Sequence, residues 1–79
     1  MDKITLEYPV PFEGGELKEI SIRRPKVSDI VAARKSKKDE AEQEITMISK
    51  LTDIPPETIE TLDLADYKKI QEALSGFFG

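Results

Sequence analysis

Two segments of alternating apolar and polar residues flank a pair of glycines near the start of the chain, and they limit its fold more than any other feature. Ile4, Leu6 and Tyr8 fall on one side of the first segment, and Ile20 and Ile22 fall on one side of the second. Alternation with a period of two is typical of strands, and glycine accepts the positive φ angles of tight turns. The pattern predicts an N-terminal β-hairpin.

The length of the turn decides whether this hairpin has one apolar face. A two-residue turn at the glycine pair would place the two apolar sets on opposite faces, because a register shift of one residue turns every side chain over. A three-residue loop over residues 13–15 pairs Leu6 with Ile22 and Tyr8 with Ile20 on a shared face. We therefore expect an odd-length loop with a bulge. Two prolines follow Tyr8 and cannot donate ladder hydrogen bonds, so we expect the first strand to become irregular there.

Beyond the hairpin, prolines and polar residues divide the chain into helical segments. Helical spacing of apolar residues is found in residues 26–35 and 39–53. Two consecutive prolines then end the second of these helices and favour a short third helix over residues 56–62. The spaced apolar residues are Val27, Ile30 and Val31 in the first helix, and Ala41, Ile45, Ile48 and Leu51 in the second, with Met47 at its border.

The last helix is expected to begin after Asp63, a favourable N-cap residue, with Asp66 as the second member of an imperfect capping box. Its first apolar residues follow at intervals of three and four, which is the spacing of one helix face. We expect at least two of these three to be buried. They are Tyr67, Ile70 and Leu74, and Phe77 continues the same stripe.

Together these elements predict an α+β fold, in which an N-terminal β-hairpin precedes a small bundle of three to four helices. A chain of 79 residues allows one domain with one modest core. We expect a single domain over residues 1–79, with the hairpin in residues 1–24 and the helical part in residues 26–79.

The charge is distributed unevenly along the chain. Residues 18–38 hold eight basic and two acidic side chains, whereas residues 39–79 hold three basic and ten acidic ones. Two interpretations are open: the basic segment contacts nucleic-acid phosphates, or it neutralises the acidic helices. The net charge of −4 and the lack of aromatics within the basic segment favour the second, because backbone binding needs an uncompensated positive field and aromatics stack on bases.

The sequence predicts no catalytic residue, no cofactor and no metal site. It contains no histidine and no cysteine, and its serines, lysines and carboxylates form no recognisable catalytic motif. No apolar run approaches the roughly 18 residues of a membrane span, and the first residues lack the apolar stretch of a signal peptide. We expect a non-enzymatic protein of the cytoplasm that does not enter membranes.

The order of these features resembles a known protein family. The matching features are the Ile/Leu-rich strand pair, the LKEISIRRPKVSDI junction with Arg24, Pro25 and Asp29, the acidic helix ending in LTDIPPETIETLDLADY, and the closing helix. On these features, residues 4–35 and 41–77 resemble the tail assembly chaperones of Mu-like phages and related prophages, described as protein E and its counterparts. The terminal motif is the more specific part, since many families share such a hairpin.

The resemblance implies a protein-binding role without catalysis. Such chaperones hold the long, helical tape measure protein in the bacterial host cytoplasm until tail tube subunits polymerise around it, and they are absent from the mature virion. The implied partners are the tape measure protein, a frameshift-extended form of the chain itself and, as a further candidate, the tail tube protein. Two alternatives remain open: a small structural or connector subunit of the phage particle, and a regulator that binds nucleic acid through residues 18–38.

The Phe77-Phe78 pair also has two interpretations. The family frequently makes a longer product by programmed frameshifting, and two phenylalanine codons can form a run of uridines on which a ribosome shifts. Alternatively, Phe77 completes the apolar stripe and Phe78 is a C-terminal lid. Consecutive helical residues point about 100° apart, so one of the pair is expected to stay partly exposed. The residues expected to contact a partner are Tyr67, Ile70, Leu74, Phe77 and Phe78.

Overall fold

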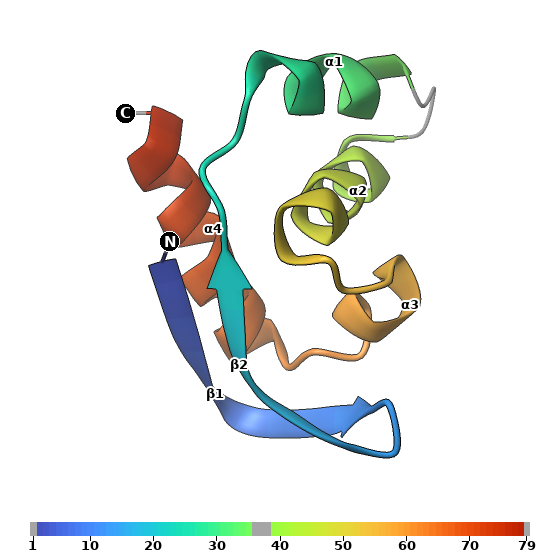
Figure 1. Cartoon of the computed structure of the whole chain (residues 1–79), viewed down its shortest axis with the longest axis vertical. Coiled ribbons are helices and arrows are strands. Elements are labelled where there is room, and N and C mark those ends of the chain that lie inside the picture. The colour runs from blue at the N-terminus through green and yellow to red at the C-terminus, as the bar shows by residue number, and fades with distance from the viewer. Residues whose placement is uncertain (1, 36–38, 79) are drawn as a thin grey trace.

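A two-stranded antiparallel hairpin and four helices make up the computed structural model, which describes residues 2–35 and 39–78 (Figure 1). The elements are β1 (Asp2–Phe12), β2 (Gly15–Ile22), α1 (Val27–Lys35), α2 (Glu40–Thr52), α3 (Pro56–Ile59) and α4 (Leu64–Phe78). The predicted α+β fold, with a hairpin ahead of a small helical part, is confirmed.

The hairpin turn contains two residues, so the predicted three-residue loop is wrong. Glu13 and Gly14 have φ angles of 49° and 79°, and Phe12 pairs with Gly15 across them. Two consecutive positive φ angles are typical of the type I′ turn, whose twist matches that of the flanking strands. Next to the turn, even-numbered residues of β1 therefore pair with odd-numbered residues of β2. Continued along the hairpin, this register would turn the isoleucines of the two strands to opposite faces.

A bulge in β1 restores the common face. Between the paired residues Thr5 and Val10, β1 has four residues where β2 has only Lys18. The register beyond the bulge pairs Ile4 with Ile20, so even-numbered residues now face even-numbered residues. The apolar face of the hairpin thus depends on an irregularity in the middle of β1.

The outcome for the predicted hairpin face is mixed. Tyr8 lies in the bulge, does not pair with Ile20 and is 54% exposed, because the register differs from the predicted one. The predicted irregularity of the first strand near Tyr8 is confirmed by the register shift between Thr5 and Val10, and pairing resumes at Val10 and continues to Phe12. Of the residues expected on the shared apolar face, all except Tyr8 are buried, namely Ile4, Leu6, Ile20 and Ile22. The predicted pairing of Leu6 with Ile22 is wrong, since Ile22 pairs with Asp2.

The bulge is held by Asp66, a fully buried carboxylate on α4. Its Oδ1 accepts the N–H of Glu7 at 2.9 Å, and its Oδ2 accepts the N–H of Tyr8 at 3.1 Å. The Lys69 ammonium lies 3.7 Å from Oδ1. Burial alone would raise the pKa of Asp66, but the two N–H donors and Lys69 together bring that pKa below its ordinary value. Two backbone N–H groups that the bulge removes from the strand ladder are thereby paired.

Asp66 therefore does not complete the predicted capping box. Asp63 accepts the N–H of Ala65 at 2.9 Å, as an N-cap residue does, and this part of the prediction is confirmed. The carboxylate of Asp66 instead turns towards β1, because the hairpin supplies two donors that have no other acceptor in the sheet.

The helices cover the apolar face of the hairpin. α4 packs on β1, α2 packs on β2, and α3 contacts both α2 and β1. The N–H of Arg23, just after β2, donates to the carbonyl of Leu51 at 3.2 Å and joins the end of the hairpin to α2. The buried cluster comprises Ile4, Leu6, Ile20, Ile22, Ile48, Leu51, Ile54, Ile59, Ile70 and Leu74.

α1 is the helix with the least apolar burial. It packs on α2 at the edge of the molecule, as Figure 1 shows. Its spaced valines are exposed, Val27 at 77% and Val31 at 44%, whereas Ala33 and Asp29 are buried. The predicted helix is present, but the face that it buries holds Ala33 and Asp29 rather than the two valines. α3 is also shorter than predicted and ends at Ile59.

Replacing Asp66 by Asn tests the role of this carboxylate. The amide keeps one acceptor oxygen, so one of the two bulge N–H groups would face an N–H₂ donor. We expect a loss of about 2–4 kcal/mol in the free energy of unfolding, measured by urea denaturation. Asp63→Asn is the matched control on the same helix, because Asn is an equally good N-cap. Equal stability of the two variants would show that the bulge does not depend on Asp66.

Candidate functional site

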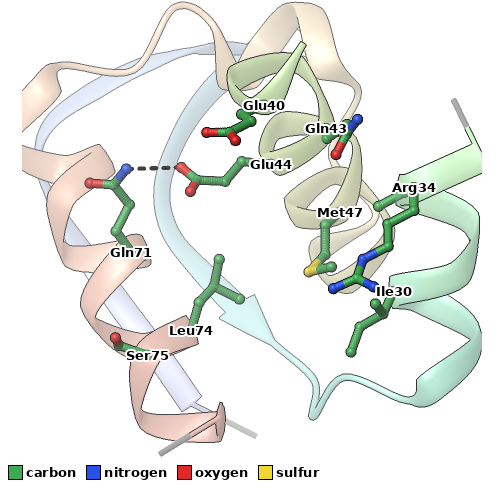
Figure 2. A pocket seen from close by; sticks show the side chains of 10 residues that line it. Ile30, Arg34, Glu40, Gln43, Glu44, Met47, Gln71, Leu74 and Ser75 are labelled. Atoms are coloured by element: carbon green, nitrogen blue, oxygen red, sulfur yellow. Dashed lines mark hydrogen bonds between the residues drawn. The ribbon is translucent and has the colours of Figure 1, made fainter. Parts of the chain in front are cut away.

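An open groove of about 480 Å³ lies between α1, α2 and α4. It exists because α2 and α4 pack on different strands of the hairpin, and α1 packs on α2. All three helices contribute to its walls, as Figure 2 shows. The lining residues are Ile30, Ala33 and Arg34 from α1, Glu40, Gln43, Glu44 and Met47 from α2, and Gln71, Leu74 and Ser75 from α4.

The apolar part of the groove comes from one long side chain on each helix. Ile30 of α1 and Met47 of α2 are half-buried, and Leu74 of α4 is 7% exposed. Covering apolar surface stabilises a complex by about 25 cal/mol per Å², and the flexible thioether of Met adapts to different shapes. These three side chains form a surface that an apolar group of another molecule can cover.

Glu44 links the α2 and α4 walls. Its Oε1 accepts the hydroxyl of Tyr67 at 2.5 Å and the Nε2 of Gln71 at 2.9 Å; the latter bond is dashed in Figure 2. Burial raises the pKa of Tyr67 well above its usual range, and the Glu44 carboxylate raises it further. The hydrogen bonds from Tyr67 and Gln71 to Glu44 thus connect α4 with α2 across the groove.

Two charged side chains line the groove without an ion-pair partner. Arg34 comes from the last turn of α1, and Glu40 comes from the first turn of α2. Within residues 2–35 and 39–78, neither of them takes part in an ion pair. Both are exposed, so they remain available to charges on a bound molecule.

The α1 wall is anchored by Asp29. Arg23 donates to it through two nitrogens, at 2.8 and 2.9 Å, and the N–H of Lys26 donates to Oδ2 at 2.8 Å. Together these bonds lower the pKa of Asp29 to about 2. The hydrogen bond from the Arg23 side chain makes the largest contribution, and the Lys26 N–H follows. A carboxylate in the first turn that binds the N–H just before the helix also satisfies a group that helix geometry leaves unpaired. Asp29 thus fixes α1 to the end of β2.

Comparison with protein families gives a match that covers nearly the whole chain. A family model described as "Phage tail assembly chaperone proteins, E, or 41 or 14" matches residues 3–79. The chain belongs to this phage tail assembly chaperone family. The match includes the hairpin and every residue of the groove, and it confirms the predicted resemblance. No curated protein and no solved structure matches the chain.

The residues predicted to bind a partner differ in their exposure to solvent in this tail assembly chaperone. Ile70 is fully buried and Leu74 is 7% exposed, so the expectation that at least two of the first three residues are buried is confirmed. Leu74 also reaches the groove, and Tyr67 is half-buried with its hydroxyl bound to Glu44. Contact of these residues with a partner stays a prediction, and Leu74 is the one of the three that lines the groove.

Phe77 is half-buried at the end of α4. It packs against the core, and the guanidinium carbon of Arg24 lies 5.5 Å from its ring centroid. This is the distance of a cation–π contact. Phe77 is thus partly exposed, as one of the pair was expected to be, while the side chain of Phe78 lies outside the described residues. A contact of either residue with a partner stays a prediction.

The arginines of the basic segment, residues 18–38, contact other parts of the fold or line the groove. Arg23 pairs with Asp29, an acid of the same segment rather than of the acidic helices, and Arg24 covers Phe77. Arg34 faces the groove. The structure does not describe residues 36–38, where two further lysines lie. The described arginines therefore hold α1 and α4 or line the groove.

Sequence analysis missed most of the groove. It placed partner binding at the C-terminus, whereas Glu44 and Gln71 meet only because the hairpin positions α2 and α4 opposite each other. The available signal was Met47, which borders the apolar stripe of α2 without belonging to it. Methionine serves both as a gap filler in cores and as an adaptable residue of binding surfaces, so the sequence alone does not identify a groove.

Among residues 2–35 and 39–78, no group of three or more His, Cys, Asp or Glu side chains is arranged to hold a metal ion. Within the same residues, the helices are too short or too polar to cross a membrane.

Replacing Asp29 by Asn tests the anchor of the α1 wall. Because the folded pKa is about 2 and the ordinary value is about 3.9, the ionised carboxylate stabilises the fold above pH 4, and this contribution is lost as pH falls towards 2. We therefore expect Asp29→Asn to lower the melting temperature at pH 6 and to have a much smaller effect at pH 2. A destabilisation of the same size at both pH values would contradict this account of the Arg23–Asp29 pair.

Proposed function

We propose that this tail assembly chaperone binds the tape measure protein of its phage and keeps it soluble in the host cytoplasm until tail tube subunits polymerise around it. The family membership supports a role in tail assembly. The observation that carries the proposal is the open groove, which presents Ile30, Met47 and Leu74 from three helices. A long helical partner with unburied apolar residues aggregates unless such a surface covers them.

The role proposed is one of binding, without catalysis. The chain has no histidine or cysteine, and the groove presents charged and amide groups around an apolar floor. Release is part of the proposal, because tube subunits must displace the chaperone and leave it out of the virion. A small groove open to solvent suits such reversible capture, since affinity falls when little surface is covered.

Co-expression tests the proposal. The tape measure protein of the same phage is produced with and without this chain, and its soluble fraction is measured. We expect the chaperone to raise that fraction and to co-purify with the tape measure protein. An unchanged soluble fraction without co-purification would refute the proposed function. Recovery of the chain from purified virions would instead favour the structural or connector subunit.

A variant that fills the groove tests where binding occurs. Ser75 is exposed on α4 and lines the groove, so Ser75→Arg puts a long side chain into it without disturbing the core. We expect binding about tenfold weaker, a loss of about 1.4 kcal/mol, at an unchanged melting temperature. Ala65→Arg is the control, because Ala65 is a small exposed residue of the same helix outside the groove. If both variants bind the tape measure protein equally, binding lies elsewhere.

The proposed longer product is tested at the level of codons. Synonymous recoding of Phe77 and Phe78 leaves the protein unchanged, so its stability must not change. If the pair serves the ribosome, recoding abolishes the extended form seen on a gel, whereas an unaltered extended form excludes the role of these codons. Deleting residues 77–79 is a different experiment, because it also removes the Phe77 contacts with the core and Arg24.

A further inference from the structure

Resting on the proposed function, we infer that the groove takes one amphipathic helix of the tape measure protein, laid between α4 on one side and the packed pair α1 and α2 on the other. The apolar stripe of this helix covers Ile30, Met47 and Leu74. On its flanks it carries an acidic residue facing Arg34 and a basic residue facing Glu40.

The lining of the groove favours apolar side chains over a small polar ligand. Sites for small polar molecules orient them with a few polar groups set inside an enclosed pocket. Here every buried side-chain nitrogen or oxygen of the described residues already has a hydrogen-bond partner. Glu44, the most internal acid of the groove, accepts from Tyr67 and Gln71. What remains to be covered is the apolar surface of the three long side chains.

The occupant is a helix because the walls offer nothing to an extended chain. Extended segments bind mainly by adding a strand to an open sheet edge, through main-chain hydrogen bonds. All three walls of the groove are helices, so none of them presents the open strand edge that an extended segment needs. A segment that satisfies its own backbone hydrogen bonds loses none on entering, and residues at i, i+3, i+4 and i+7 supply the apolar stripe.

The charges of Arg34 and Glu40 determine which charged residues we expect on the two flanks of the bound helix. Arg34 and Glu40 come from different helices, and within the described residues neither is engaged in an ion pair. A partner helix that places opposite charges against them gains electrostatic complementarity, which sets orientation and association rate. A helix with like charges at these positions is disfavoured for the same reason.

The experiment uses overlapping 30-residue synthetic peptides that tile the tape measure protein, with binding to the full chain followed by fluorescence anisotropy. We expect one or a few helix-forming peptides to bind wild type. Arg34→Glu and Glu40→Lys each weaken the same peptides by about three- to tenfold, more at low salt than at high salt. Reversing the acidic residue of the peptide restores binding to Arg34→Glu.

Matched controls separate a specific contact from a change in net charge. Lys35→Glu makes the same change on α1 next to Arg34, and Glu42→Lys makes the same change in the first turn of α2. Neither residue lines the groove. We expect both controls to bind within twofold of wild type.

The outcomes distinguish this inference from the proposed function. If wild type keeps the tape measure protein soluble but the groove variants and their controls bind alike, the inference is wrong and the proposed function stands. Binding of peptides that stay non-helical in circular dichroism also overturns it. If the chain self-associates in analytical ultracentrifugation and Arg34→Glu dissociates it, a second copy occupies the groove instead. If wild type binds no peptide and does not solubilise the full-length protein, both proposals fail.

Discussion

The buried carboxylate of Asp66 determines which residues of the hairpin enter the core. The two-residue turn sets a register that would place the isoleucines of β1 and β2 on opposite faces of the hairpin. The bulge brings them to one face, but it leaves N–H groups of β1 without a partner in the strand ladder. Asp66 pairs with the N–H groups of Glu7 and Tyr8, so the bulge carries no unsatisfied donor there. The same contact fixes α4 against β1. The position of the closing helix and the face of the sheet are therefore linked through one side chain, while Ile70 and Leu74 add the apolar contacts of α4 with the core.

The groove follows from that arrangement. α4 is tied to β1 and α2 packs on β2, so the two helices stand apart, and Glu44 bridges them. α1 cannot contribute much apolar burial, since its valines face solvent, and Asp29 anchors it through Arg23. Three helices that are each secured at a different point leave an open space between them. The site is thus a consequence of how a short chain attaches its helices to a two-stranded sheet.

Local patterns predicted the elements of this chain, and long-range contacts limited the rest. The alternation of the strands, the prolines and the N-cap at Asp63 are local signals, and the structure agrees with them. The turn length was wrong because the parity argument assumed one register throughout, whereas the bulge changes it. Nothing near Glu7 in the sequence reveals its acceptor, which lies 59 residues away. The groove was missed for the same reason, since its walls adjoin only after the sheet has set the helices in place.

Folding and the proposed capture of a partner use different side chains of the same helices. On α4, Asp66 and Ile70 are buried towards the hairpin, whereas Gln71 and Ser75 face the groove. Adjacent residues on a helix point about 100° apart, so one turn supplies both functions without sharing atoms. Leu74 is the exception, because it belongs to the core and also reaches the groove. If the groove binds the partner as proposed, changes at its rim alter the choice of partner while the hairpin and its buried cluster stay intact. On the proposed function, this separation would let the affinity stay low enough for tube subunits to displace the chaperone without a cost to its stability.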